Sequence, residues 1–279
     1  MRFGAYTPTS NHYDIPALVS LAQDTEAAGW DGFFIWDNLM ATFDGTNVLA
    51  DTTVALTAIA ISTRRVRFGA IVTALPRRRP WKFAKETATL DQISQGRLVV
   101  GVGLGGTWDF LPFGEETDER VRGAVLDEGL EVVTALWSGS AIDHEGEHFT
   151  LTGARIAPKP RQRPRIPIWV AGYWPGTRPF RRAARWDGVA PLRSDHAFSG
   201  LTPDELRSCV DYVQRHRSTP DPLEVVHFQT AREPSGSLIR DYARAGATWW
   251  LESTFPPEED LAKFRERVRA GPPGLGAAD

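Results

Sequence analysis

The sequence alternates short apolar runs with amphipathic stretches eight times, and this alternation constrains the fold more than any other feature. The apolar runs are nearly continuous, which suits parallel strands that are buried on both faces. The amphipathic stretches repeat apolar residues at helical spacing, as Leu126, Leu130 and Val133 do. Eight strand–helix units close a barrel, and an open doubly wound sheet is the competing arrangement. The pattern therefore predicts an α/β protein, a single-domain (β/α)8 TIM barrel.

Capping and turn residues set the limits of the expected elements. Asp14 caps a first helix, which Gly29 ends, and Pro80 opens a later helix, where its missing N–H would be unpaired anyway. No helix is expected over residues 107–114, and the next one begins near Glu119. The expected strands are residues 3–6, 33–36, 66–73, 98–102, 166–171, 188–191, 224–230 and 247–251.

Length and composition fit this fold and exclude several classes of protein. The chain has 279 residues, and one such barrel needs about 250. We expect residues 1–270 to form the barrel and residues 271–279 a flexible tail. A net charge of −3 gives no basic field for nucleic acid, and no run of 18 apolar residues predicts a membrane span. One cysteine, Cys209, and no secretory leader fit a cytoplasmic protein.

Two motifs match known patterns but fail in their context. His144-Glu-Gly-Glu-His148 has the spacing of a zinc protease, which needs both histidines on one helix face. Gly146 disfavours a helix there, so we expect a β-hairpin or loop and no metal site. Residues 101–106 contain the dinucleotide pattern G-x-G-x-x-G, but no helix is expected to begin directly after it. Its glycines, Gly103 and Gly105 among them, would let the backbone approach something flat or bulky.

The active site of such a barrel lies at the C-terminal ends of its strands. After the fifth strand comes a glycine-rich turn, with Gly172 and Gly176, and then Thr177 and Arg178 at a helix start. Free backbone N–H groups, a hydroxyl and a cation suit a phosphate, which the helix dipole also favours. The alternative is an ordinary capped helix with a surface arginine.

Other strand ends carry side chains with two interpretations each. Asp37 either accepts a hydrogen bond from a heterocycle or caps a turn. The residues 77–79, all arginine, either hold an anionic tail or lie in solvent. Trp108 either walls a ring-binding pocket or belongs to the core.

Taken together, these segments resemble the luciferase-like monooxygenase family, which includes FMN-dependent monooxygenases and F420-dependent dehydrogenases. Residues 1–6, 27–37 and 67–80 are similar to the family, and residues 86–105, ETATLDQISQGRLVVGVGLG, are the most specific segment. Downstream, PIWVAG at 167–172 and AARWDG at 183–188 continue the match. The resemblance is close over residues 1 to 191 and loose beyond them.

The resemblance implies an oxidoreductase that binds FMN or coenzyme F420 at the barrel mouth. The ring would lie against the end of the third strand, at Ile71, Val72 and Thr73, with a non-proline cis peptide near Ile71–Val72. Asp37 would face the polar edge of the ring. The phosphate would lie at Gly172, Gly176, Thr177 and Arg178, and the substrate beside Asn38 and Trp108, under loops 38–50 and 107–118.

Two positions depart from some F420-dependent members of the family. Asn38 stands where those members have a histidine that takes part in proton transfer, and Gly106 stands where they have a glutamate. The resemblance also implies a homodimer, a small-molecule substrate and a separate flavin or F420 reductase as a partner. Two alternatives stay open: a non-catalytic flavin- or ligand-binding member of the same fold, and a barrel enzyme with a phosphorylated substrate and no flavin.

Overall fold

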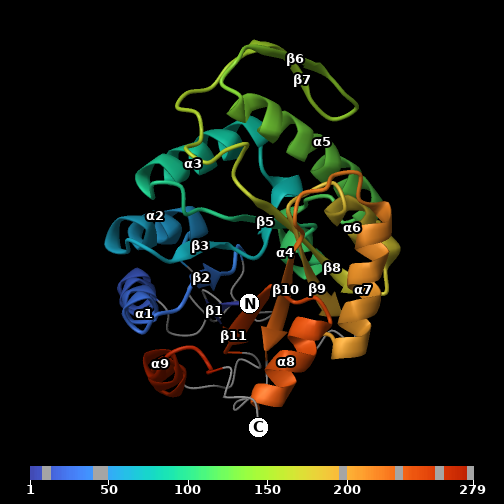
Figure 1. Cartoon of the computed structure of the whole chain (residues 1–279). Coiled ribbons are helices and arrows are strands. Elements are labelled where there is room, and N and C mark those ends of the chain that lie inside the picture. The colour runs from blue at the N-terminus through green and yellow to red at the C-terminus, as the bar shows by residue number, and fades with distance from the viewer. Residues whose placement is uncertain (8–13, 40–49, 195–199, 230–234, 255–260, 275–279) are drawn as a thin grey trace.

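The computed structural model describes residues 1–7, 14–39, 50–194, 200–229, 235–254 and 261–274 (Figure 1). Parallel strands form a barrel, and helices surround it. The barrel strands are β1 (Arg2–Thr7), β2 (Gly32–Ile35), β3 (Arg67–Ala70), β4 (Thr73–Ala74), β5 (Val100–Gly103), β8 (Ile168–Trp174), β9 (Gly188–Arg193), β10 (Glu224–Gln229) and β11 (Trp249–Ser253). The helices are α1 (Ile15–Ala27), α2 (Thr52–Ser62), α3 (Pro80–Ile93), α4 (Thr107–Phe110), α5 (Glu119–Trp137), α6 (Thr177–Ala183), α7 (Pro203–His216), α8 (Gly236–Arg244) and α9 (Leu261–Ala270).

The strands follow the order β3-β2-β1-β11-β10-β9-β8-β5-β4, and every neighbouring pair is parallel. β3 and β4 are two parts of one strand, interrupted at Ile71 and Val72. Phe68 of β3 bridges to Leu98, just before β5, so the strand made of β3 and β4 lies beside both β2 and β5 and closes the barrel. The barrel therefore has eight strand positions, as the sequence predicted.

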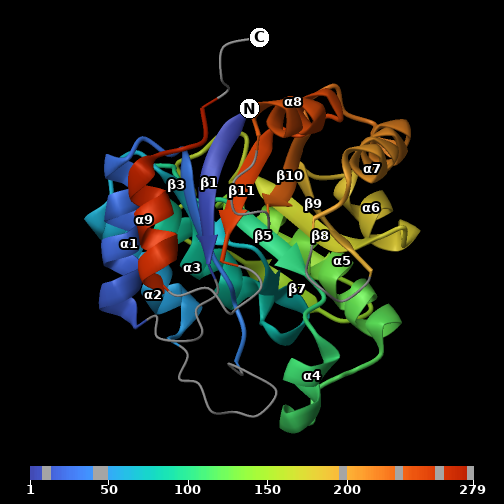
Figure 2. The same cartoon turned by 90° about the horizontal axis from the view of Figure 1, so that it is seen from below.

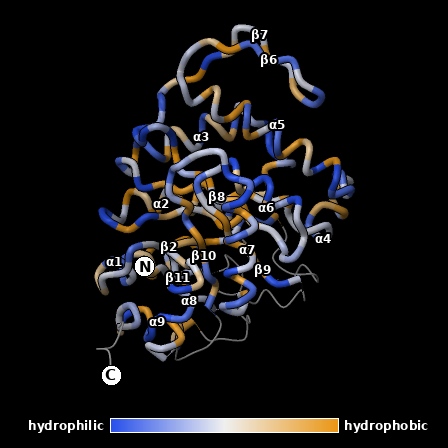
Figure 3. The backbone as a smooth tube through the Cα atoms, turned by 45° about the vertical axis from the view of Figure 1, so that its right-hand side comes forward, coloured by the Kyte–Doolittle hydropathy of each residue, from blue (hydrophilic) through white to orange (hydrophobic). Residues whose placement is uncertain are grey.

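Side chains of the strands alternate between two apolar layers, because successive residues of a strand point to opposite faces. Phe33 and Ile35 pack outward against the helices, whereas Phe34 packs inside the barrel. The inner layer is aromatic: the Phe34, Trp169 and Trp249 rings lie 5.3–5.6 Å apart between centroids. Hydrophobic residues gather along the strands in the tube view (Figure 3).

The N-terminal end of the barrel is closed by charges around Glu224 at the start of β10. The indole N–H of Trp169 donates to Glu224 over 2.9 Å, Arg67 lies 3.6 Å from it, and Arg2 forms a further ion pair. Arg2 also lies over the Trp249 ring, 5.2 Å from its centroid. Side chains of the described residues fill this end, and in barrels of this kind the active site lies at the opposite one.

The predicted helix ends agree with the structure for the first helices. The Asp14 side chain accepts from the Ala17 N–H at the start of α1, and Gly29 follows α1 with a φ of +89°. Pro80 is the first residue of α3. α1 and α9 lie side by side, so the last described helix closes against the first (Figures 1 and 2).

The predicted absence of a helix over residues 107–114 is wrong. A single turn, α4, follows Gly106, and a 3-10 turn, η2 (Leu111–Phe113), follows α4. Pro112 does not break this segment, because proline in the first turn of a helix gives up an N–H that has no partner there. Gly114, with a φ of +65°, ends the segment.

A β-hairpin, not a helix, carries the two histidines of the zinc-protease pattern. β6 (Ile142–Glu145) pairs with β7 (Thr150–Ala154) antiparallel, beyond α5 (Figure 1). Glu128 of α5 accepts from the backbone N–H groups of His148 and Phe149 over 2.9 and 2.8 Å. The predicted hairpin is confirmed, and the Glu128 carboxylate holds it against α5.

No described helix is long and apolar enough to cross a membrane. Residues 275–279 of the expected tail, and residues 40–49 of the loop expected over the substrate, lie outside the described residues.

Candidate functional site

Aromatic and apolar side chains meet inside the barrel at the C-terminal ends of the strands. Tyr6 of β1 packs against Phe228 of β10 and Trp36 after β2, with ring centroids 5.1 and 6.3 Å away. Val72, Ala171 and Leu192 pack against the same inner cluster. We call these six residues the mouth cluster. In Figure 2, α4 extends beyond this end of the barrel, on the side away from the N-terminus.

The third strand breaks at the mouth, where the resemblance implied a cis peptide. The Ile71–Val72 bond is cis and does not involve proline, so this prediction is confirmed. The Tyr6 hydroxyl donates a hydrogen bond to the Ile71 carbonyl over 2.7 Å. Thr73, the next predicted site residue, begins β4 and is buried. The interruption therefore places a short bulge, residues 71 and 72, beside the mouth cluster.

The glycines of β5 and its loop make room for this bulge. A Cβ on Gly101 would lie 2.3 Å from the Ala70 carbonyl oxygen, and one on Gly103 would lie 2.8 Å from a Val72 methyl. Gly105 has a φ of +78°, and a Cβ there would lie 2.6 Å from the Phe110 ring. The backbone at these glycines is therefore in close contact with its neighbours, as expected, and these neighbours are strand three and α4.

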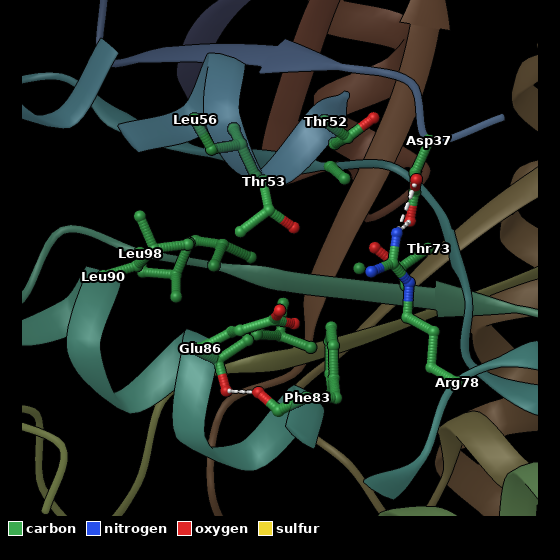
Figure 4. A pocket seen from close by; sticks show the side chains of 15 residues that line it. Asp37, Thr52, Thr53, Leu56, Thr73, Arg78, Phe83, Glu86, Leu90 and Leu98 are labelled. Atoms are coloured by element: carbon green, nitrogen blue, oxygen red, sulfur yellow. Dashed lines mark hydrogen bonds and ion pairs between the residues drawn. The ribbon is translucent and has the colours of Figure 1, made fainter. Parts of the chain in front are cut away.

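Asp37 is paired with an arginine in the structure. Both of its carboxylate oxygens accept from one Arg78 nitrogen, over 2.8 and 2.7 Å (Figure 4). The pair lies at one end of a narrow cavity between α2, α3 and the strands β3, β4 and β5. Thr52 and Thr73 also line this cavity. Asp37 thus has a protein partner, and its contact with a cofactor stays a prediction.

The other two arginines of this loop also have protein contacts. Arg77 donates to Asp109 over 2.7 Å and to Glu115 over 2.9 Å, and it lies over the Phe110 ring, 4.1 Å from its centroid. Arg79 lies over Trp81, 5.8 Å from the ring centroid. Carboxylates thus pair with Arg77 and Arg78, and contact of residues 77–79 with an anionic tail stays a prediction.

The substrate-side residues lie on two loops that are held together. Asn38, half-buried, follows β2 in the chain, and the next N–H, of Leu39, donates to Asp109 over 3.3 Å. Trp108 stands in the same turn, α4, with its indole against Gly106. The structure thus brings Asn38 and Trp108 onto adjoining loops at the C-terminal end of the barrel.

The loop after β8 leads into α6, whose N-terminus has no side-chain cap. Gly176 is the N-cap of α6, where no side chain accepts from the helix, and Thr177 and Arg178 are exposed. The Gly176 N–H donates to the Tyr173 carbonyl over 3.0 Å. A Cβ on Gly172 would lie 2.2 Å from Pro179, so this glycine lets α6 pack on β8. An anion can meet the first N–H groups of α6 without displacing a cap.

Sequence reasoning missed the aromatic residues of the mouth. The sequence predicts strands at Tyr6, Trp36 and Phe228 but assigns these residues no place in the site. Alternation along each strand places all three on the inner face near a strand end. Tyr173, one position beyond Gly172, also lies on this face, and partial burial raises its pKa. Counting inward positions at the C-terminal ends of the strands would have identified them.

Fold and site together define a closed α/β barrel with an aromatic mouth at the C-terminal ends of its strands. The family model of luciferase-like monooxygenases matches residues 1–222, so the chain belongs to this family. The predicted family and fold are confirmed.

Relatives in the family include monooxygenases and F420-dependent dehydrogenases. An F420-dependent glucose-6-phosphate dehydrogenase of Nakamurella multipartita is 31% identical over 263 residues, which are 93% of this chain and 75% of that protein. The 4-hydroxyprotoasukamycin monooxygenase of Streptomyces nodosus subsp. asukaensis is 28% identical, over 95% of this chain and 75% of that protein. A solved F420-dependent secondary alcohol dehydrogenase has a similar fold, with a TM-score of 0.79 at 17% identity and 99% of each chain covered. These comparisons support the predicted class, an oxidoreductase that depends on F420 or FMN.

Proposed function

We propose that this protein transfers a hydride between a small organic substrate and F420, or activates oxygen on reduced FMN, with the ring at the mouth cluster. The observation that carries the proposal is the aromatic and apolar end of the barrel beside the Ile71–Val72 bulge. A flat heterocycle gains most from such a surface, because aromatic rings supply large apolar contact areas. The residues present therefore fit a flavin-type ring.

We assign the phosphate of the cofactor to the loop after β8. Gly176, Thr177 and Arg178 offer N–H groups, a hydroxyl and a cation, and no side chain caps this helix. Ile71, Val72 and Thr73 would contact the ring from strand three. Gly103 makes room for Val72 of the bulge and Gly105 makes room for Phe110 of α4, so both would let the backbone lie close to the cofactor. Gly172 would act through the packing of α6. Asn38 and Trp108 would face the substrate.

The cofactor would supply the redox chemistry, and the protein would bind, orient and exclude water. Burial raises the pKa of Tyr6 well above its usual value, so its hydroxyl stays protonated and neutral at the mouth. An apolar, aromatic mouth can orient a ring and exclude water, which suits a reaction carried by the cofactor ring.

The first test is a parallel titration of the protein with FMN and with F420, followed by cofactor fluorescence. Saturable binding of one of them is expected. Arg178→Met should weaken its affinity about tenfold, because a charge-assisted contact to phosphate contributes about 1.5 kcal/mol. Arg181→Met is the matched control, since Arg181 is exposed on the same helix and should leave the affinity unchanged. Binding of neither cofactor by the folded protein would contradict the proposal.

We also propose a homodimer formed through α2 and α3. α2 carries apolar residues on its outward side as well as toward the core, and its outward residues Val54 and Ile61 are 55% and 58% exposed. Trp81 and Ile93 add exposed apolar area on α3. Light scattering after size exclusion should give twice the mass of one chain, 30.9 kDa. Ile61→Glu should shift this mass toward the monomer, and an unchanged mass would contradict the interface.

The cellular setting follows from the same proposal. A separate flavin or F420 reductase would supply reduced cofactor. Cys209 is the only cysteine of the sequence and is buried, which suits a reducing cytoplasm.

A further inference from the structure

The Tyr6 side chain links the mouth cluster to the bulge by a hydrogen bond. Its ring is 8% exposed and packs between Trp36 and Phe228. Its hydroxyl donates to the Ile71 carbonyl over 2.7 Å. Trp36 follows β2, so Tyr6 of β1 lies between the end of β2 and Phe228 of β10, and its hydroxyl reaches the interrupted third strand.

The direction of this hydrogen bond is fixed. A carbonyl oxygen can only accept, so the Tyr6 hydroxyl donates its proton to Ile71. Burial raises the pKa of Tyr6 well above its usual value, so the hydroxyl keeps its proton at neutral pH.

The side of the bulge that faces β5 is in close contact with the glycines of that strand. The Cβ positions of Gly101 and Gly103 are taken by the Ala70 carbonyl and by Val72. Contacts of this kind prevent the bulge from moving toward β5. On the other side two hydrogen bonds hold Ile71, because its N–H donates to the Ile35 carbonyl over 2.9 Å and its carbonyl accepts from the Tyr6 hydroxyl. The bond from Tyr6 comes from a side chain, so a substitution can remove it.

We propose that Tyr6 is a positioning residue. Its hydrogen bond to the Ile71 carbonyl holds the Ile71–Val72 bulge in the position in which the bulge contacts the cofactor ring. This inference rests on the proposed function. Tyr6 need not touch the cofactor, since it acts through the bulge. A buried hydroxyl that only stabilised the fold would affect unfolding but not the affinity for the ring.

The structure contains a matched control for this distinction. Tyr242 of α8 is 8% exposed, and its hydroxyl donates to the Leu201 carbonyl over 2.9 Å, on the outer side of the barrel strands. Tyr6→Phe and Tyr242→Phe each remove one buried hydroxyl and keep the ring. Both variants should therefore lose similar stability.

The experiment measures urea unfolding and the fluorescence titration with FMN and F420 for both variants. Tyr6→Phe should raise the Kd of the cofactor that binds about fivefold, the effect of one net hydrogen bond. Tyr242→Phe should leave this Kd unchanged at equal loss of stability. Gly103→Ala, whose methyl would press on Val72 rather than remove a hydrogen bond, should also raise the Kd, by displacing the bulge from the other side.

The outcomes separate the two proposals. If the unmodified protein binds neither cofactor, the proposed function fails. If it binds one of them, and Tyr6→Phe binds equally well, the positioning role alone is refuted. An equal weakening in Tyr6→Phe and Tyr242→Phe would refute it too, since a general loss of stability would then explain both.

Discussion

Because His227 is buried, we expect the free energy of unfolding of this protein to fall in mild acid. It is 3% exposed on β10, its ring stacks on Tyr242 with centroids 3.6 Å apart, and its Nε2 lies 3.2 Å from the Gln229 oxygen. Burial lowers its pKa to about 4, and the hydrogen bond with Gln229 opposes this only in part. The imidazole is therefore neutral in the folded protein at every pH above that value.

The sign and size of the effect follow from linkage. In the unfolded chain a histidine has a pKa of about 6.5, so falling pH protonates the unfolded chain first and favours unfolding. The stability that neutral His227 contributes is complete above pH of about 6.5 and is lost as the pH falls toward about 4. A difference of about 2.5 pKa units, at about 1.4 kcal/mol each, is about 3 kcal/mol in total. About 2 kcal/mol of this should be gone at a pH of about 5.

Urea unfolding of the unmodified protein and of His227→Phe, each at two pH values, measures this difference. Carboxylates that also titrate in acid are common to both proteins, so they cancel in the comparison. Between a pH of about 7.5 and about 5, the unmodified protein should lose about 2 kcal/mol more stability than the variant. Phenylalanine keeps a ring against Tyr242 but cannot take up a proton. Equal losses in the two proteins would show that His227 binds its proton as readily when folded, and the reasoning from burial would be refuted.

Three further predictions concern parts of the structure away from the proposed cofactor. Glu224→Leu should cost about 2–3 kcal/mol in urea unfolding, because it leaves the buried Trp169 N–H without its acceptor; a loss within experimental error would contradict the role given to Glu224. Arg77→Met should cost about 3–5 kcal/mol, because it leaves the buried Asp109 carboxylate without its ion pair; a variant as stable as the original protein would show that this pair contributes nothing. The thiol of Cys209 is buried, with its pKa raised to about 12, so Ellman's reagent should react with it only as fast as the protein unfolds, and rapid labelling of the native protein would disprove that.

Local signals in the sequence were sufficient for the barrel but not for the contacts between its loops. Nearly continuous apolar runs predicted buried parallel strands, and residues such as Asp14 and Pro80 predicted where helices begin. The helical turn at α4 was missed because Pro112 was read as an interruption, although proline is well placed in the first turn of η2.

The roles of the arginines depended on partners far away in the sequence. Arg77 pairs with Asp109, 32 residues later, and Arg78 with Asp37, 41 residues earlier. Nothing in the local sequence distinguishes a paired arginine from a free one, because the pairing is created by the meeting of loops at the barrel end. The hydrogen bond between Tyr6 and Ile71, which are 65 residues apart, could not be predicted for the same reason.

The filled base of the barrel has a consequence for the proposed turnover. Trp169 and Trp249 occupy the interior below the mouth, and Glu224 with its arginines closes the end beneath them. A cofactor and a substrate bound at the proposed positions would then both enter from the mouth side, and the one that lies deeper would enter first and leave last. With the ring on the mouth cluster and the substrate between Asn38 and Trp108, as proposed, we expect steady-state kinetics of compulsory order in which the cofactor binds first.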